Sequence, residues 1–290
     1  MNVNFRLSRM VRRNAWMAGA VLLLGVGCAA PTDGQDPETN TQNDDLKAGS
    51  ADHTAGSQIR LHEGTDAPEM MAEAETDAVA ATVLGCDVSG HQGNVNWAAA
   101  WNAGARFCYV KATEGTSYRN PNFAQQYNGS YNQGMIRGAY HFALPNNSSG
   151  TAQADFFVDH GGGWSGDGKT LPPALDMEYN PYGATCYGLS ASSMVQWVRD
   201  FSNRVHARTR KYPMIYTSTS WWSQCTGNNG GFGGTNPLWI PRYGSSVGTL
   251  PAGWGYHTIW QYADSGSMPG DQNRFNGAYD RLQALATNPD

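Results

Sequence analysis

The sequence has little charge, few cysteines and no metal-binding spacing. Only 15 % of its 290 residues are charged, and it has 5 cysteines against 35 glycines and 10 tryptophans. A chain so poor in charge and so rich in glycine and aromatic residues is not typical of a disordered protein, a coiled coil or a basic nucleic-acid-binding protein. Its longest apolar run is too short to cross a membrane, and no Cys-x-x-Cys or His-x-x-x-His pair indicates a metal site. We therefore expect no cofactor, no nucleic-acid partner and no transmembrane span.

The few charges divide the chain into three parts. Residues 1–28 contain four arginines and no acid, and residues 29–82 contain twelve acids against Lys47 and Arg60. Residues 83–290 are close to neutral, with 13 basic and 12 acidic side chains, and they include nine of the ten tryptophans. A neutral, tryptophan-rich domain favours stacking on sugars or other neutral rings over binding to nucleic acid or anionic lipid.

Residues 1–28 have the features of a signal peptide. Four arginines precede an apolar run over residues 15–27, and Cys28 with two alanines follows it. Residues 24–28 also resemble a bacterial lipoprotein box whose leucine is displaced by one position. Simple cleavage with secretion and lipid anchoring at Cys28 both remain open. Either outcome places the mature protein outside the cytoplasm, where disulfides persist.

Residues 29–82 are interpreted as an acidic linker or pro-segment. The stretch over residues 31–57 is dominated by Asp, Thr, Asn, Gly and Gln and has almost nothing to bury. Residues 69–81 are expected to form a weak acidic helix, because methionines and alanines alternate there with glutamates. No catalytic role is assigned to this part of the chain. The composition changes abruptly at Val83, where the predicted catalytic domain (83–290) begins.

From Val83 onward, short apolar runs alternate with helical patterns. The strand-like runs cover residues 83–89, 106–113, 136–143, 173–178, 213–219, 238–243 and 257–263. Helices are expected before Gly104 and Gly134. A third helix is expected after Ser190 or Ser192 as its N-cap, because one apolar stripe follows there. This alternation predicts a parallel sheet with right-handed crossovers.

Continuous rather than alternating hydrophobicity in these runs favours a closed, modified (β/α) barrel with mostly parallel strands. The helical pattern weakens after Thr219, where a glycine-rich loop over residues 226–235 is expected to replace a helix. The predicted fold is therefore an α/β barrel with helices missing on its late side. An open, doubly wound sheet is the alternative.

Four cysteines remain after the signal peptide. Cys186 and Cys225 lie in loops that follow the fourth and fifth strands, which are neighbours in a barrel, so we expect a disulfide between them. Cys86 and Cys108 lie inside adjacent strands. Two buried thiols and a second disulfide are both compatible with that placement.

The carboxylates indicate a site. Residues 83–290 contain only two glutamates, Glu114 and Glu178. Glu178 ends an apolar run that includes Asp176, and residues two apart in a strand share a face, about 7 Å apart at Cα. Both are expected at the C-terminal mouth of the barrel, where barrel enzymes have their active sites. Such a pair can keep one acid protonated and the other ionised, as glycoside cleavage requires. Asp87 similarly ends the first strand, and Asp271 follows the last one.

Seven short motifs follow one another along residues 83–290. They are Asp87-Val-Ser-Gly-His-Gln92-Gly, Tyr109-Val-Lys-Ala-Thr-Glu114-Gly, Arg137-Gly-Ala-Tyr140-His141-Phe142, Leu175-Asp176-Met-Glu178, Ile215-Tyr216-Thr-Ser, Trp239-Ile-Pro-Arg-Tyr243 and Trp260-Gln261-Tyr262. Together they resemble glycoside hydrolase family 25, the Chalaropsis-type lysozymes, and look especially similar to its secreted actinobacterial members.

This resemblance implies an N-acetylmuramidase that cuts the β-1,4 bond between N-acetylmuramic acid and N-acetylglucosamine in peptidoglycan. It implies retention of configuration, with the substrate's own acetamido group as nucleophile. By position, Glu178 matches the proton donor and Asp176 the carboxylate that orients the acetamido group. Asp87 and Asp271 match further acids of the site. The residues that match the substrate groove are Tyr140, Tyr216, Trp239 and Gln261.

Two other classes of function remain open. A peptidoglycan-binding module without catalysis would keep the tryptophans but usually lose acids, and all four acids are present. A chitinase-like barrel would have further aspartates two and five residues before Asp176, where this chain has Ala174 and Leu171. The protein is expected to act as a secreted monomer on peptidoglycan glycan strands.

Overall fold

The computed structural model describes residues 52–65 and 82–290. The expected signal peptide (1–28), Cys28 and the helix expected over residues 69–81 lie outside the described residues. No helix of the described part of the chain is both long and apolar enough to span a membrane.

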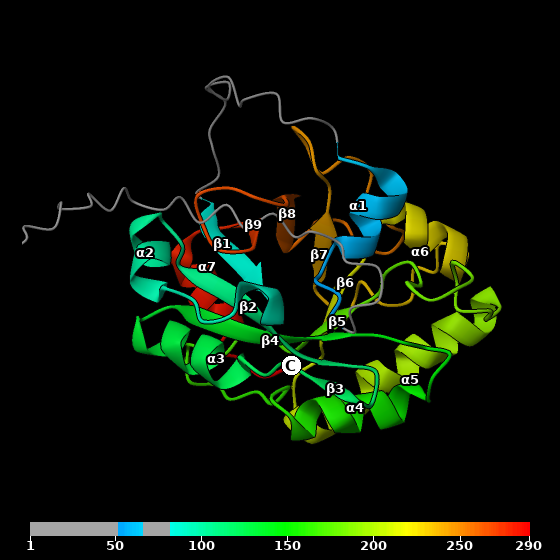
Figure 1. Cartoon of the computed structure of the whole chain (residues 1–290). Helices are drawn as coiled ribbons and strands as arrows, with labels where there is room; N and C mark the ends of the chain where they lie inside the picture. The colour runs from blue at the N-terminus through cyan, green and yellow to red at the C-terminus, as the bar shows by residue number, and fades with distance from the viewer. Residues whose placement is uncertain (1–51, 66–81) are drawn as a thin grey trace, which may run out of the picture. The chain divides into compact units, whose positions relative to one another are not determined.

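Strands and helices alternate along the described chain (Figure 1). The strands are β1 (Val83–Val88), β2 (Phe107–Glu114), β3 (Tyr118–Arg119), β4 (Ile136–Phe142), β5 (Ala174–Asp176), β6 (Met214–Tyr216), β7 (Leu238–Pro241), β8 (Ile259–Ala263) and β9 (Asp271–Phe275). The helices are α1 (Ser57–Glu63), the short 3-10 helix η1 (Gly90–Gln92), α2 (Trp97–Asn102), α3 (Phe123–Asn132), α4 (Gly150–Asp159), α5 (Ala191–Thr209), α6 (Thr219–Thr226) and α7 (Tyr279–Leu285).

The sheet closes into a barrel, which confirms the predicted fold class. Its strand order is β1-β9-β8-β7-β6-β5-β4-β2-β3, and β1 also pairs with β2. Since β3 lies outside this ring, eight strands form the barrel. The pairings along the path β1-β2-β4-β5-β6-β7-β8 are all parallel. Strand β9 closes the ring and runs antiparallel to both β8 and β1. Because β9 runs in reverse, its first residue lies at the mouth where the parallel strands end.

The late side of the barrel differs from the prediction in two details. The strand β9 was not expected from its polar sequence, Asp-Gln-Asn-Arg-Phe. The helix α6 precedes the glycine-rich loop, where the loop alone had been expected, and the Ser218 side chain accepts the N–H of Trp221 to begin it. Within residues 82–290, no helix lies between β7 and β8 or between β8 and β9.

The predicted helices α2, α3 and α5 are present. The first two are followed by Gly104 and Gly134 with φ of 103° and 95°, values that favour glycine. Ser190 is the N-cap of helix α5, and its side chain accepts the N–H of Ser193. Its apolar stripe is buried against the barrel; the stripe comprises Met194, Trp197, Val198, Phe201 and Val205.

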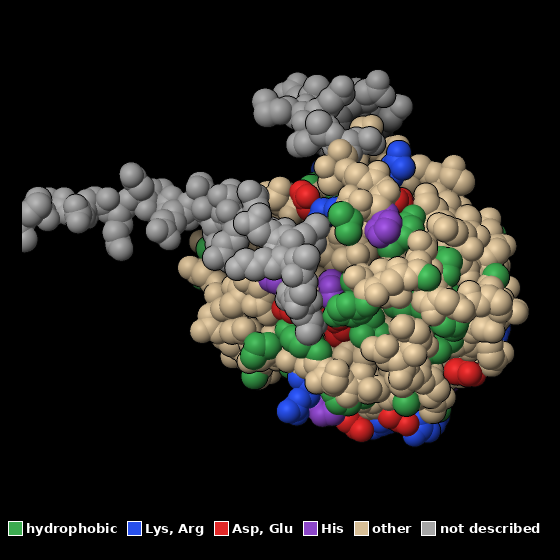
Figure 2. Space-filling model, turned by 45° about the vertical axis from the view of Figure 1, so that its right-hand side comes forward, with side chains coloured by type: hydrophobic (Ala, Val, Ile, Leu, Met, Phe, Trp, Pro, Cys, Tyr) green, Lys and Arg blue, Asp and Glu red, His purple; other side chains and the backbone are tan. Residues whose placement is uncertain are grey.

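Aromatic rings fill the barrel interior below the mouth. The Tyr109 ring stacks on Trp239 with 4.8 Å between centroids, and Tyr216 meets Trp239 edge-on at the same separation. All three side chains are fully buried. The barrel is thus a packed core that supports the mouth from below. On the face shown in Figure 2, blue and red side chains lie close to one another along the lower edge, in keeping with the balanced charge of residues 83–290.

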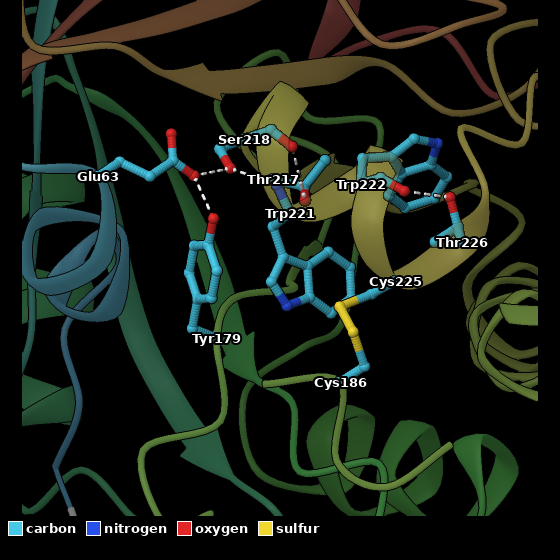
Figure 3. The surroundings of a disulfide bond; sticks show 9 residues. All are labelled: Glu63, Tyr179, Cys186, Thr217, Ser218, Trp221, Trp222, Cys225 and Thr226. Carbon is cyan, nitrogen blue, oxygen red and sulfur yellow. Dashed lines mark hydrogen bonds between the residues drawn. A yellow bond between two sulfur atoms is a disulfide. The ribbon is translucent and has the colours of Figure 1, made fainter. Parts of the chain in front are cut away.

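A disulfide ties the loop after β5 to helix α6 (Figure 3). It joins Cys186 to Cys225, the pair expected from the sequence. Cys86 and Cys108 are cross-strand partners in β1 and β2, and both are free and buried, with their Sγ atoms 2.7 Å apart. The sequence left open whether this pair forms two buried thiols or a second disulfide, and in the structure both are thiols.

Candidate active site

The C-terminal mouth of the barrel collects the residues predicted from the sequence. Glu178 follows β5 by two residues. Each of the other seven residues comes from a different strand; they are Asp87, Tyr140, Asp176, Tyr216, Trp239, Gln261 and Asp271. The reversal of β9 places Asp271 directly opposite Asp87 in the sheet register. The structure therefore brings all eight predicted residues to one end of the barrel.

Asp176 and Glu178 form a buried acidic pair. Both side chains have no solvent exposure. Burial raises the pKa of Asp176 well above its ordinary value, and the neighbouring charge of Glu178 raises it further. Burial also raises the pKa of Glu178. Neither oxygen of Asp176 accepts a hydrogen bond from an N–H group of the described residues. The two acids together thus hold a proton more tightly than free carboxyl groups do.

Gln261 connects two further acids. Its side-chain amide donates to Asp87 and to Asp271, with 3.0 Å from nitrogen to oxygen in each case. Its amide oxygen accepts the hydroxyl groups of Tyr216 and Tyr243, each at 2.7 Å. Gln261 is fully buried, so this residue fixes the positions of its partners below the surface of the mouth.

Asn273, which no sequence pattern indicated, belongs to the same network. Its amide donates to Asp87 at 2.6 Å and its oxygen accepts the indole N–H of Trp239 at 2.8 Å. Asn273 lies two residues after Asp271 in β9, so both point to the same face of the strand. Recognition of β9 as a strand would have identified it. Trp239 is enclosed by barrel side chains in this structure.

A second buried pair of charged residues, this time of opposite charge, lies at the end of β2. No sequence pattern indicated it. Lys111 and Glu114 are 2.7 Å apart from Nζ to Oε2, and both side chains are almost fully buried. Burial alone would raise the pKa of Glu114, but Lys111 and His53 outweigh it and lower that pKa to about 2. The hydroxyl of Tyr182 donates to Glu114 at 3.2 Å. Glu114 is thus an ionised acceptor, unlike the acidic pair at the end of β5.

Residues 52–65, which were interpreted as part of a linker or pro-segment, lie in the same mouth. The backbone N–H groups of Gln58 and Ile59 donate to Oε2 of Glu178 at 2.9 and 3.0 Å, and that of Gly56 donates to Oε1. Arg60 contacts Asp271 at 2.9 Å. Composition could not reveal these contacts, since the segment is mostly polar and short.

The fold and the site define a class of enzyme. An acidic pair with raised pKa values at the C-terminal mouth of a barrel is the arrangement that hydrolyses glycosidic bonds. Among the described residues, no group of three or more His, Cys, Asp or Glu side chains could hold a metal ion. The mouth carries carboxylate, hydroxyl and amide groups, together with the charged side chains of Lys111 and Arg60.

Comparison with known proteins agrees with this class. Residues 86–271 match the model of glycosyl hydrolases family 25, and the chain belongs to this family. The N,O-diacetylmuramidase of Chalaropsis sp. is 55 % identical over 210 residues, which are 71 % of this chain and all of that protein. Lysozyme M1 of Streptomyces globisporus is 44 % identical over 97 % of each chain.

Solved structures give the same result. The bacterial lysozyme from Streptomyces coelicolor has a TM-score of 0.70 and 50 % identity, covering 73 % of this chain and 99 % of that one. The family 25 lysozyme from Aspergillus fumigatus has a TM-score of 0.71 and 51 % identity, covering 72 % and 100 %. Both likenesses extend over nearly the whole of the solved chain.

Proposed function

We propose that this protein is a muramidase that hydrolyses the β-1,4 bond between N-acetylmuramic acid and N-acetylglucosamine in peptidoglycan. The observation that carries the proposal is the buried pair formed by Asp176 and Glu178 at the mouth of the barrel. Family membership and the lysozymes to which the chain is similar support the same substrate.

Glu178 acts as the general acid in this proposal. Burial raises its pKa, so the side chain can carry a proton at a pH where an exposed glutamate has lost it. It donates this proton to the leaving glycosidic oxygen, and the resulting carboxylate then accepts a proton from the attacking water. Glu178 extends one methylene further than Asp176, which suits the longer reach to the leaving oxygen.

Asp176 stabilises the positive charge that develops in the transition state. Without substrate, its oxygens accept no N–H group of the described residues. In the complex the acetamido N–H of the sugar donates to Asp176, and this donor together with the developing positive charge favours the ionised carboxylate. The acetamido carbonyl oxygen then attacks the anomeric carbon from the face opposite the leaving group. Water opens the resulting oxazolinium ion from the other side, and two inversions give net retention.

Asp87 and Asp271 serve as positioning residues, and Tyr140, Tyr216 and Gln261 line the groove. Trp239, which matches a groove residue of the family, is enclosed by barrel side chains here and supports the groove from below. The shared amide of Gln261 keeps both acids in place. Their negative charge favours the cationic transition state over the neutral ground state, which is the condition for catalysis by electrostatic stabilisation.

The proposal is tested by incubating the protein with purified peptidoglycan and measuring new reducing ends. Glu178→Gln keeps nearly the same shape and removes the acid, so we expect the rate to fall by roughly 10²–10⁴-fold. Asp280→Asn, at an exposed acid of α7, is the control and should retain the wild-type rate. Binding to peptidoglycan without new reducing ends, both by the intact chain and after removal of residues 52–65, would instead favour a binding module. Normal activity of the Glu178→Gln variant would show that another residue is the general acid.

Retention of configuration and participation of the acetamido group are tested separately. NMR of the first product formed should show the β anomer, and initial release of the α anomer would exclude retention. A substrate whose 2-acetamido carbonyl is removed should be cleaved far more slowly than the natural glycan. If both are cleaved equally fast, Asp176 becomes the direct nucleophile.

We further propose that the protein is exported and acts as a monomer. The disulfide between Cys186 and Cys225 supports an oxidising compartment. Mass spectrometry of the protein from cell and medium fractions distinguishes lipid attachment at Cys28 from simple cleavage, and the molar mass from light scattering tests the monomer.

A further inference from the structure

The segment formed by residues 52–65 lies outside the matched family domain, which begins at residue 86. It nevertheless contacts the mouth along its whole length, from Asp52 near Lys111 to Glu63 near Ser218. Helix α1 of this segment lies beside the region of β6, β7 and α6 in Figure 1.

The segment binds the proposed general acid itself. Three backbone N–H groups, those of Gly56, Gln58 and Ile59, donate to the two carboxylate oxygens of Glu178. An N–H donor needs an oxygen lone pair, and three donors on one carboxyl group favour its ionised form. These three N–H groups oppose the effect of burial on the pKa of Glu178 and occupy both of its oxygens, so neither oxygen can reach a leaving glycosidic oxygen.

The segment also contacts the proposed positioning and groove residues. The N–H of Ala55 donates to the hydroxyl of Tyr140 at 3.2 Å, and its carbonyl oxygen accepts the amide of Gln261 at 3.2 Å. Arg60 forms an ion pair with Asp271 at 2.9 Å. A sugar ring cannot reach these groups while the segment contacts them.

Both ends of the segment are fixed to the rim of the mouth. At one end, Lys111 donates to the backbone carbonyl of His53 at 2.5 Å and lies 3.0 Å from Asp52. At the other end, Glu63 accepts the hydroxyl groups of Tyr179 and Ser218 (Figure 3). The anchors lie on different strands and loops, so the segment crosses the mouth.

The fit is close enough to exclude an added methyl group. Ala55 and Ile59 are 0 % and 2 % exposed. A Cβ atom built on Gly56 would lie 2.7 Å from Oε1 of Gln261 and 2.8 Å from the hydroxyl of Tyr216, and would overlap Tyr243. These separations are shorter than van der Waals contacts, so glycine alone fits at this point.

We propose that residues 52–65 are an internal inhibitor that occupies the glycan groove and slows the enzyme until the segment is displaced or cut from the barrel. This inference rests on the proposed muramidase function. The segment is covalently attached, so its effective concentration at the mouth is on the order of millimolar, and weak contacts suffice to keep it bound. Cleavage of the chain between the segment and the barrel removes that advantage.

The decisive experiment compares Gly56→Ala with Gly64→Ala in the full chain after export. Both glycines have positive φ, +89° and +76°, so alanine strains the backbone at either position. Only Gly56 lies against barrel side chains, whereas a Cβ on Gly64 meets nothing within 4 Å. We expect Gly56→Ala to release reducing ends from peptidoglycan at least about ten-fold faster than wild type, because overlap with packed atoms displaces the segment. Gly64→Ala should stay as slow as wild type.

A second variant removes the inhibitor without a point mutation in it. Residues 70–75 are replaced by the recognition sequence of a site-specific protease, and the purified chain is assayed before and after cleavage and dilution. The rate should rise to that of Gly56→Ala. Hydrogen exchange supplies a readout independent of activity: the amides of Gln58 and Ile59 should be protected in the intact wild type and exchange fast in Gly56→Ala.

The outcomes separate the two proposals. If intact wild type is as active as Gly56→Ala and the cleaved chain, the inhibitor proposal is wrong and the muramidase proposal stands. Fast exchange at Gln58 and Ile59 in the wild type would also overturn the inhibitor, since the segment would not be docked. If Gly56→Ala exchanges fast and the cleaved chain is free of the segment, yet none releases reducing ends, the muramidase proposal fails and the inhibitory role fails with it.

Discussion

The buried imidazole of His141 should make the stability of this protein depend on pH. His141 lies in β4 next to Tyr140 and has no solvent exposure. Its Nε2 lies 3.0 Å from the amide oxygen of Gln153, and its Nδ1 lies 2.8 Å from the hydroxyl of Thr113. An amide oxygen only accepts, so Nε2 carries the proton and Nδ1 accepts from the hydroxyl. Both ring nitrogens are therefore satisfied by the neutral form.

The size of the effect follows from the pKa of this ring. Burial is the largest influence and lowers the pKa of His141 from 6.5 to about 4. Between these values the unfolded chain binds a proton that the folded protein does not, so the free energy of unfolding falls as the pH falls. A difference of about 2.5 in pKa, at 1.36 kcal/mol each, corresponds to about 3 kcal/mol lost between pH 6.5 and pH 4.

Urea unfolding of wild type and His141→Gln at several pH values from 7 to 4 measures this contribution. Glutamine can keep the hydrogen bond to Gln153 but does not titrate. We expect the variant to be less stable at pH 7 and to lose about 3 kcal/mol less than wild type as the pH falls, since the carboxyl groups are common to both proteins. Parallel pH dependences for the two proteins would refute the reasoning.

Three further changes test the site and its support. Asp176→Asn should abolish activity yet raise the free energy of unfolding at pH 7 by roughly 1–2 kcal/mol, because it removes an acid whose pKa is raised by burial; a lower melting temperature would contradict this. Serine at both Cys186 and Cys225, 39 residues apart, should cost about 4 kcal/mol in urea unfolding, and an unchanged midpoint would exclude a stabilising disulfide. Trp239→Phe should cost roughly 1–3 kcal/mol by leaving Asn273 without its indole donor, and equal stability would show that donor to be dispensable.

The overall fold could be predicted because its elements carry strong local signals. Apolar runs marked seven of the strands, and helices ended at Gly104 and Gly134 because positive φ favours glycine there. Strand β9 escaped prediction for the opposite reason. Its residues face the site and are polar, and pairing with β1 and β8 on either side makes it a strand. Such pairing between distant segments has no local sequence pattern.

The candidate site divides in the same way. The pairing of Asp176 and Glu178 could be predicted from the sequence, since residues two apart in a strand lie on one face. The network around Gln261 could not, because it joins side chains from β1, β8 and β9 that are 174 and 10 residues apart along the chain. Only closure of the barrel, with β9 reversed, brings these groups within hydrogen-bonding distance.

The sequence by itself determined the barrel class, the disulfide pair and the acids at the mouth, because periodicity, spacing and motif order are properties of short stretches of chain. The tertiary structure decided that residues 52–65 lie over those acids. Their composition resembles that of a linker, and their contacts with Glu178 come from backbone N–H groups, which every residue type except proline possesses. Contacts made by the backbone leave no trace in a sequence, so only the folded chain reveals them.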